Sequence, residues 1–250
     1  MTADISLSQE THFLTTLDGQ RIAYSHDKGG HRRAIILAHG YFNNKDTFLF
    51  RQIADMLIEK FDVIRFDFRG HGQSSGWFSW TAKESNDLKC VLNYASQRYP
   101  KVGVLAFSLG GAIAIVEASV NPQIQSLMTV SAPASVWGIN YHFWKKEMWQ
   151  DLLLNLGPKG KGKRVRPGFP FDRKIKPIDV VHRIAPRPIC FVHGANDWLI
   201  LPRHSLRLFE NARDPKECYI LDGTGHAEKI ADQAPDRFKR LCLDWFMSSI

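Results

Sequence analysis

The stretch Leu105-Ala106-Phe107-Ser108-Leu109-Gly110-Gly111 is the strongest local signal in the chain and decides its fold. The apolar run Val102–Phe107 predicts a strand that passes through Ser108 directly into a helix rich in Ala and Gly. A serine at so sharp a corner has a strained backbone, so the residues two positions before and after it must be small. Ala106 and Gly110 meet this requirement. The alternative is a serine that only caps a helix, because small-x-Ser-x-Gly also occurs by chance.

Strand-like and helix-like segments alternate on both sides of this corner. Short apolar runs predict buried strands, and amphipathic stretches predict helices that cover them. The predicted strands are Arg21–Ser25, Ala34–His39, Val63–Asp67, Val102–Phe107, Leu127–Ser131, Pro188–His193 and Glu217–Leu221, and the predicted helices are Thr47–Lys60 with Asp46 as its cap, Thr81–Arg98, one after Ser108, Ser205–Asn211 and Pro235–Phe246. Repeated β-α units predict the α/β class, with a mostly parallel, doubly wound sheet of about eight strands.

One region interrupts the alternation. Between Ala134 and Arg183, roughly fifty residues separate two strands where one crossover helix would suffice. We expect one domain, with a core of residues 1–133 and 184–250 and a short helical cap, or lid, of residues 134–183. The cap is expected over the carboxyl ends of the strands, where open α/β sheets bind their ligands.

The charge of the chain is concentrated in this insertion. The 250 residues carry a net charge of +8, and from Lys145 to Lys176 ten Lys or Arg residues stand against three acidic residues, a net charge of +7. A nucleic-acid-binding protein would usually spread its basic residues over a face of the fold, so we expect no nucleic-acid partner. The basic loop Gly157–Arg164 is either solvated or a weak contact for an anionic substrate, an acidic carrier protein or an anionic lipid surface.

Other features exclude several classes of protein. A hydrophobic fraction of 44% and a charged fraction of 23% exclude wholesale disorder. No apolar run is long enough to cross a membrane, and the polar stretch Met1–Thr11 lacks the pattern of a secretion signal, which predicts a cytoplasmic protein. The four cysteines form no CxxC pair and the histidines no HExxH motif, so we expect reduced thiols, no metal and no cofactor.

A serine becomes a nucleophile at neutral pH only beside a base. His226, in Asp222-Gly223-Thr224-Gly225-His226-Ala227, follows the last predicted strand and can therefore reach the edge of the sheet where Ser108 lies. The other nine histidines are weaker candidates: His39, His71 and His193 lie near strand ends, but a glycine follows each, and His204 is expected to be solvated.

The base needs a carboxylate that orients its ring and stabilises its cation. Asp197 follows the penultimate strand, and the stretch after the strand that ends at Ser131 has no acidic residue from Ala132 to Lys146. An oxyanion would be held by the amide of Leu109, at the start of the helix, and by that of Tyr41, after His39-Gly40. The alternative for Gly40 is a glycine that merely ends a strand.

Taken together, these residues resemble the α/β-hydrolase superfamily, from about Leu14 to Phe246. Asp67-Phe68-Arg69-Gly70-His71-Gly72-Gln73-Ser74 matches the family's DxRGxGxS-type segment, and Ala106 stands where most members have Gly. The order Ser108, Asp197, His226 is that of the family's catalytic triad. The resemblance is strongest to its branch of serine esterases, monoacylglycerol lipases and feruloyl esterases. It implies the α/β-hydrolase fold and hydrolysis without a cofactor.

Large side chains recur at helical spacing within the insertion. Trp137, Tyr141, Trp144 and Met148 share one face of a predicted helix and would roof a substrate pocket. The alternative is a helix that only packs on the domain.

We therefore expect a serine hydrolase that cleaves carboxylic esters of small molecules through an acyl-enzyme intermediate. Two alternatives keep the triad: a thioesterase that acts on coenzyme A or carrier-protein thioesters, and a peptidase. A third belongs to another class, a ligand-binding protein with little turnover.

Overall fold

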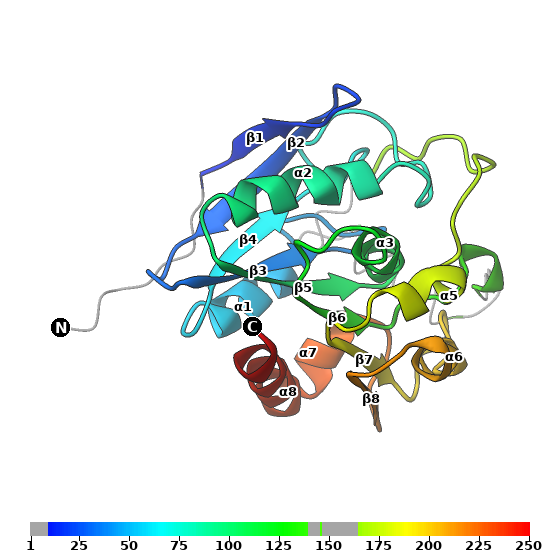
Figure 1. Cartoon of the computed structure of the whole chain (residues 1–250). Helices are drawn as coiled ribbons and strands as arrows, with labels where there is room; N and C mark the ends of the chain where they lie inside the picture. Colours follow the sequence, from blue (N-terminus) through cyan, green and yellow to red (C-terminus); the bar gives the residue numbers. More distant parts are fainter. Residues whose placement is uncertain (1–9, 140–145, 147–164) are drawn as a thin grey trace.

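The sheet at the centre of the protein has eight strands in the order β1-β2-β4-β3-β5-β6-β7-β8. The computed structural model of the protein describes residues 10–139, 146 and 165–250 (Figure 1). Strand β2 is antiparallel to β1 and β4, and the remaining neighbours are parallel. The strands are β1 His12–Thr15, β2 Arg21–Asp27, β3 Arg33–Ala38, β4 Asp62–Phe66, β5 Lys101–Phe107, β6 Ser126–Val130, β7 Ile189–Gly194 and β8 Lys216–Leu221. The predicted α/β class and mostly parallel sheet are confirmed.

Helices cover both faces of the sheet (Figure 1). They are α1 Phe48–Leu57, α2 Ser85–Ser96, α3 Leu109–Ala118, α5 Pro177–Val180, α6 Arg203–Asn211, α7 Lys229–Gln233 and α8 Pro235–Ser249, with the 3-10 turns η1 Val136–Gly138 and η3 Val181–Arg183. Within β3, Ile36 packs in the core on the side of α2, α3 and α6, and Ile35 and Leu37 pack in the core with α1, α7 and α8. Because both faces are covered, the strand is apolar from Ala34 to Ala38 rather than alternating.

Two helices begin later than the sequence predicts. Helix α1 starts at Phe48 with Thr47 at its N-cap position, so the prediction of Asp46 as the cap was wrong. The carboxylate of Asp46 accepts a hydrogen bond from Lys45 Nζ at 2.7 Å and lies 3.4 Å from Arg65 Nη1. Helix α2 starts at Ser85 rather than Thr81, because the φ angles at Trp80 and Thr81 are 56° and 79°, which no right-handed helix can accommodate.

The ends of the predicted cap are tied to the core. The amide of Ile178 donates to the carbonyl of Ala134 at 3.1 Å, so the first and last parts of the insertion meet. Val180 and Val181 are buried in the core cluster beside the sheet. The division into core and cap stays a prediction, since residues 140–145 and 147–164 lie outside the described part of the chain.

Helix α3 packs so closely on the end of β3 that Gly110 has no room for a side chain. A Cβ there would lie 2.3 Å from the carbonyl oxygen of His39 and 2.7 Å from that of Ala38. We predict that Gly110→Ala lowers the free energy of unfolding by about 3 kcal/mol, as expected of overpacking against backbone that cannot yield. Urea unfolding measures the change.

Gly225→Ala is the matched control, because the nearest atom to its Cβ would be 3.5 Å away, in ordinary contact. Its effect should stay within about 0.5 kcal/mol. Equal stability of Gly110→Ala and Gly225→Ala would contradict the close packing of α3 on β3.

Candidate active site

The parallel strands end in register at one edge of the sheet. Ala38 of β3 pairs with Ala106 of β5, and Val130 of β6 pairs with both Phe107 of β5 and Val192 of β7. Loops that follow these strands therefore converge on the same edge. Ser108 follows β5, Asp197 follows β7 and His226 follows β8, and this topology brings three residues distant in sequence to one place.

The corner at Ser108 has the strained backbone that the sequence predicts. Its φ angle is 51° and its ψ angle −123°, a combination that L-residues rarely adopt. The amide of Ser108 donates to the carbonyl of Val130 at 2.8 Å, which holds the corner against β6. The side chain is nearly buried, with 7% of the residue exposed.

A chain of two hydrogen bonds joins the three predicted catalytic residues. Ser108 Oγ lies 2.9 Å from Nε2 of His226, and Nδ1 of the same ring lies 2.7 Å from Oδ2 of Asp197. Asp197 is an acceptor only, so Nδ1 carries the proton and donates it, and Nε2 is left free to accept from the hydroxyl. The arrangement can therefore take the proton of Ser108.

The loops that carry Asp197 and His226 are packed directly on each other. A Cβ on Gly194 would lie 2.1 Å from the carbonyl oxygen of Gly225, so only glycine allows this approach. The amide of Asn196 donates to the carbonyl of Thr224 at 2.9 Å. The second carboxylate oxygen of Asp197 accepts from the amides of Leu199 at 3.0 Å and Ile200 at 2.9 Å. Both loops, and hence both side chains, are held in place by backbone contacts.

The electrostatics of the pair favour a charged imidazolium. Burial alone would raise the pKa of Asp197 and lower that of His226, since it disfavours charge. The attraction between the two charges has a larger effect on both pKa values than burial has. A hydrogen bond from His193 lowers the pKa of Asp197 further. The pKa of Asp197 is therefore well below its usual range, and the pKa of His226 is raised above 6.5. His193 Nε2 lies 3.2 Å from Asp197 Oδ2.

The loop after β3 lies against Ser108. A Cβ on Gly40 would be 3.1 Å from the Cβ of Ser108. His39 accepts the amide hydrogen of Phe68 at Nε2, 3.0 Å away, so its proton is on Nδ1, which donates to the carbonyl oxygen of Gly40 at 2.7 Å. The carbonyl of Gly40 and the amide of Tyr41 belong to one trans peptide and point in opposite directions. This bond therefore fixes the direction of the Tyr41 amide.

A second histidine holds the next peptide of this loop. His71 Nε2 lies 2.5 Å from the carbonyl oxygen of Tyr41. Burial lowers the pKa of His71 to about 4 and holds that of His39 well below 6.5, so both rings are neutral at pH 7. Leu109 is buried and opens α3, where the first amides of a helix have no partner within the helix.

His204 differs from its prediction. It was expected in solvent, but it is 4% exposed, and this prediction was wrong. Its Nδ1 accepts from the amide of Ala134 at 3.2 Å, and its Nε2 donates to the carbonyl of Gly138 at 3.0 Å. The contact joins α6 to the start of the insertion, and no local pattern in the sequence signals partners so far away along the chain.

The residues predicted to roof a pocket are described only in part. Trp137 lies in η1 and is 64% exposed. The prediction that it begins a helix shared with Tyr141 was wrong, because the backbone is extended at Ile139, directly after η1. Tyr141, Trp144 and Met148 lie outside the described residues. Two aromatic residues beside the site, Phe78 and Trp80, had no recognised signal. The rings of Trp80 and Tyr41 stack with centroids 4.8 Å apart, and the ring of Phe78 lies 5.3 Å from that of Tyr41. Their place after the Asp67–Ser74 segment is the signal that could have indicated them.

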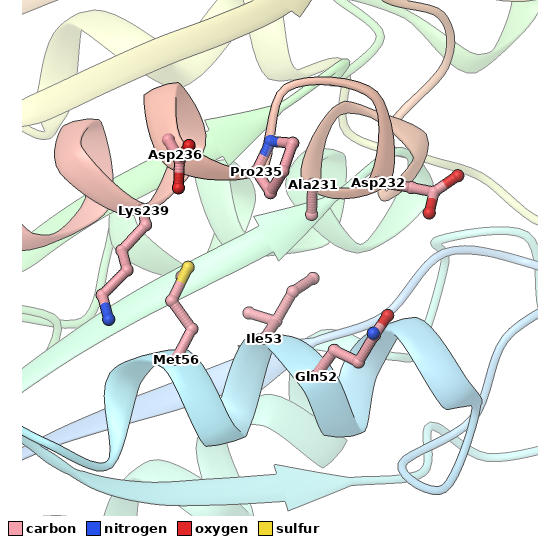
Figure 2. Close-up of a pocket in the computed structure, with 8 residues that line it drawn as sticks. All are labelled: Gln52, Ile53, Met56, Ala231, Asp232, Pro235, Asp236 and Lys239. Atoms are coloured by element: carbon pink, nitrogen blue, oxygen red, sulfur yellow. The ribbon is translucent and has the colours of Figure 1, made fainter.

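A separate groove of about 320 Å³ lies between α1 and the helices α7 and α8. Figure 2 shows Ile53 and Met56 of α1 facing Ala231 and Pro235 across it. None of the residues that line it is a predicted site residue. Within residues 10–139, 146 and 165–250, no three His, Cys, Asp or Glu side chains are grouped as a metal site would require. No helix among these residues has the length and apolar character needed to cross a membrane.

Comparison with known proteins identifies the class. A sequence profile for the family described as alpha/beta hydrolase fold matches residues 33–148. The uncharacterized protein YfhR of Escherichia coli (strain K12) is 22% identical over 223 residues, which cover 86% of this chain and 70% of that protein. The uncharacterized hydrolase YugF of Bacillus subtilis (strain 168) is 29% identical over 112 residues, 44% of this chain and 40% of that protein.

Solved structures agree with this class over nearly the whole chain. The esterase Pf2001 of Pyrococcus furiosus aligns with a TM-score of 0.79 and 20% identity, covering 100% of this chain and 94% of that one. The esterase RhEst1 from Rhodococcus sp. ECU1013 aligns with a TM-score of 0.78 and 16% identity, covering 96% and 99%. The protein has the α/β-hydrolase fold, and the resemblance to the α/β-hydrolase superfamily is confirmed.

The electrostatics of the site generate a prediction that needs no substrate. We expect the Hε1 resonance of His226 to titrate above pH 6.5 in NMR spectra, because the Asp197 carboxylate stabilises the imidazolium. Asp197→Asn removes this charge and should lower the pKa of His226. His39 is the internal control, since its buried ring should stay neutral over the same range. A pKa of His226 that is unchanged in Asp197→Asn would show that the two residues do not interact.

Proposed function

We propose that the protein is a serine hydrolase that cleaves carboxylic esters of small molecules through an acyl-enzyme intermediate. The single observation that carries the proposal is the hydrogen-bonded chain from Ser108 Oγ through His226 to Asp197. The α/β-hydrolase fold and the esterases among the structural relatives support it. Similar folds host many chemistries, so the site and not the fold identifies the reaction.

In the proposed reaction, Ser108 Oγ attacks the ester carbonyl while its proton passes to Nε2 of His226. The oxyanion that forms accepts hydrogen bonds from the amides of Tyr41 and Leu109. The hydrogen bond from His39 to the carbonyl of Gly40 supports this role, because it restrains the peptide that carries the Tyr41 amide. His226 then donates its proton to the departing alcohol, which leaves Ser108 acylated. Water next gives its proton to His226, attacks the acyl group and releases the acid. Serine recovers its proton in that last step.

The pH dependence of this reaction has a definite sign. His226 must be neutral to accept the proton of Ser108, and its pKa in the folded protein is raised above 6.5. Activity is therefore full above that raised pKa and is lost as the pH falls through it. No metal or cofactor is part of the proposal.

A thioesterase is the second candidate, because it shares the triad and its carriers are anionic. The observation that favours it is the net charge of +7 between Lys145 and Lys176. Of these basic residues, Lys146, Arg173 and Lys176 are described and exposed, and Arg166 and Lys174 are described and half-buried. The others lie outside the described part of the chain: Lys145, Lys159, Lys161, Lys163 and Arg164. A thioesterase steered by this charge would lose activity steeply with salt, whereas hydrolysis of neutral esters would not.

We predict that Ser108→Ala lowers kcat for p-nitrophenyl esters by roughly 10⁴ to 10⁶-fold, because it removes the nucleophile. The release of p-nitrophenol measures the rate. The exposed Ser248→Ala in α8 is the matched control and should leave the rate unchanged. Undiminished turnover by Ser108→Ala would contradict the proposed nucleophile.

Labelling separates an enzyme from a binding protein that rarely turns over. A fluorophosphonate probe should label the wild type at Ser108 and leave Ser108→Ala unlabelled. An unlabelled wild type that still binds esters would favour the binding protein.

A further inference from the structure

Exposed aromatic side chains gather on the two segments that flank the undescribed part of the insertion. Trp137, Phe169 and Phe171, which we call the aromatic patch, are 64%, 65% and 69% exposed. The rings of Trp137 and Phe171 stack with centroids 6.4 Å apart, and Phe169 meets Phe171 edge-on at 5.5 Å. Soluble proteins rarely leave contiguous large apolar groups in water, and such a patch marks an interaction surface.

The backbone beneath the aromatic patch is anchored to the core. The amide of Phe78 donates to the carbonyl of Arg166 at 2.9 Å, and that of Gly168 donates back to the carbonyl of Phe78 at 2.8 Å. The indole of Trp80 donates to the carbonyl of Gly168 at 3.2 Å. Below Trp137, His204 holds the carbonyl of Gly138. The rings are thus presented outward by bonded backbone on both sides of the patch.

Cations accompany these rings. Arg173 and Lys176 are exposed. Lys174 is half-buried: its Nζ lies 5.6 Å from the centre of the Trp137 ring and donates to the carbonyls of Pro170 and Asp172, so it supports the patch rather than extending from it. The neighbouring Asp172 is 3.4 Å from Lys83 Nζ, so its charge is compensated. Aromatic rings beside Lys and Arg are typical of surfaces that bind anionic membranes, because the rings enter the headgroup layer and the cations attract lipid phosphates.

The aromatic patch and the candidate active site lie at the same edge of the sheet. Trp80 connects them, because its indole bonds Gly168 and its ring stacks on Tyr41, which follows the glycine beside Ser108. In Figure 1, the segment that carries Phe169 and Phe171 descends along the right-hand side of the molecule into α5. A flat surface bound at this patch would therefore meet the side of the protein where the strands end.

We propose that the aromatic patch, together with Arg173 and Lys176, binds the surface of a membrane that contains anionic lipids. The contact is peripheral: rings enter the headgroup layer and cations lie at the phosphates. Membrane binding by itself does not depend on the proposed hydrolase activity. The biological use of membrane binding rests on the proposed hydrolase function, since a membrane-bound hydrolase would act on esters that partition into the membrane.

Sedimentation with sucrose-loaded vesicles tests the binding. One set contains equal amounts of phosphatidylcholine and phosphatidylglycerol, and the other contains phosphatidylcholine alone. The Ser108→Ala protein is used, so that no lipid is hydrolysed. We expect binding to the anionic vesicles to be stronger by about tenfold or more and to weaken as NaCl is added.

Two double variants test the surface itself. Phe169→Ala/Phe171→Ala removes two rings and Arg173→Glu/Lys176→Glu reverses two charges, and each should weaken vesicle binding by about tenfold or more. The controls are Leu17→Ala, which truncates an apolar side chain that is 92% exposed, and Lys60→Glu/Lys101→Glu, which makes the same change of net charge elsewhere. The controls should bind like the parent protein.

Hydrolysis of a water-soluble p-nitrophenyl ester, measured with Ser108 intact, separates this proposal from the proposed function. Both patch variants should keep that activity while losing vesicle binding. Binding that is equal for both vesicle types, or that survives in both variants, would overturn the proposal. Self-association in sedimentation velocity that the Phe169→Ala/Phe171→Ala variant abolishes, without vesicle binding by the parent, would also overturn it and would assign the patch to a contact between copies.

Discussion

The close packing of α3 on the end of β3 is the constraint on which the rest of the structure depends. Because Gly110 lies directly against the carbonyls of Ala38 and His39, the chain must turn from β5 into α3 within one residue, Ser108. The turn requires a positive φ angle at a residue that is not glycine, which costs about 1 to 3 kcal/mol. The same packing brings Gly40 and its loop against Ser108. The backbone strain at Ser108 and the position of the Gly40 loop beside it therefore both result from the packing of α3 on β3.

The surroundings of the histidines decide which of them can do chemistry. His39 and His71 lie in buried sites, where charge is disfavoured and a neutral ring can donate one hydrogen bond, from His39 to the carbonyl of Gly40 and from His71 to that of Tyr41. His226 is half-buried and faces the carboxylate of Asp197, which stabilises its cation. The neutral rings of His39 and His71 hold neighbouring loops together through hydrogen bonds, whereas the ring of His226, beside the carboxylate, can gain and lose a proton.

Hydrogen bonds join the two ends of the predicted cap to the rest of the protein. His204 binds the first part of the insertion, the amide of Ile178 closes its two ends on Ala134, and residues 166–168 pair with Phe78. These bonds hold exposed aromatic rings on a fixed base at the edge where the strands end. Trp80 lies between these rings and the loops around Ser108, because its indole donates to the carbonyl of Gly168 and its ring stacks on Tyr41.

The sequence by itself determined the fold class and most of the strands, because buried parallel strands are continuous apolar runs. It also predicted that Ser108, Asp197 and His226 meet at one edge of the sheet, because the loops after parallel strands converge there. It misplaced the start of two helices and the burial of His204, since the φ angles at Trp80 and Thr81 and the partners of His204 depend on contacts made far along the chain. Only the tertiary structure decided that His39 orients the Tyr41 peptide, that Trp80 stacks beside it, and that Trp137, Phe169 and Phe171 form one surface. The reason is physical: periodicity records which side of an element is buried, whereas the direction of a peptide or the meeting of two rings depends on how separate segments pack.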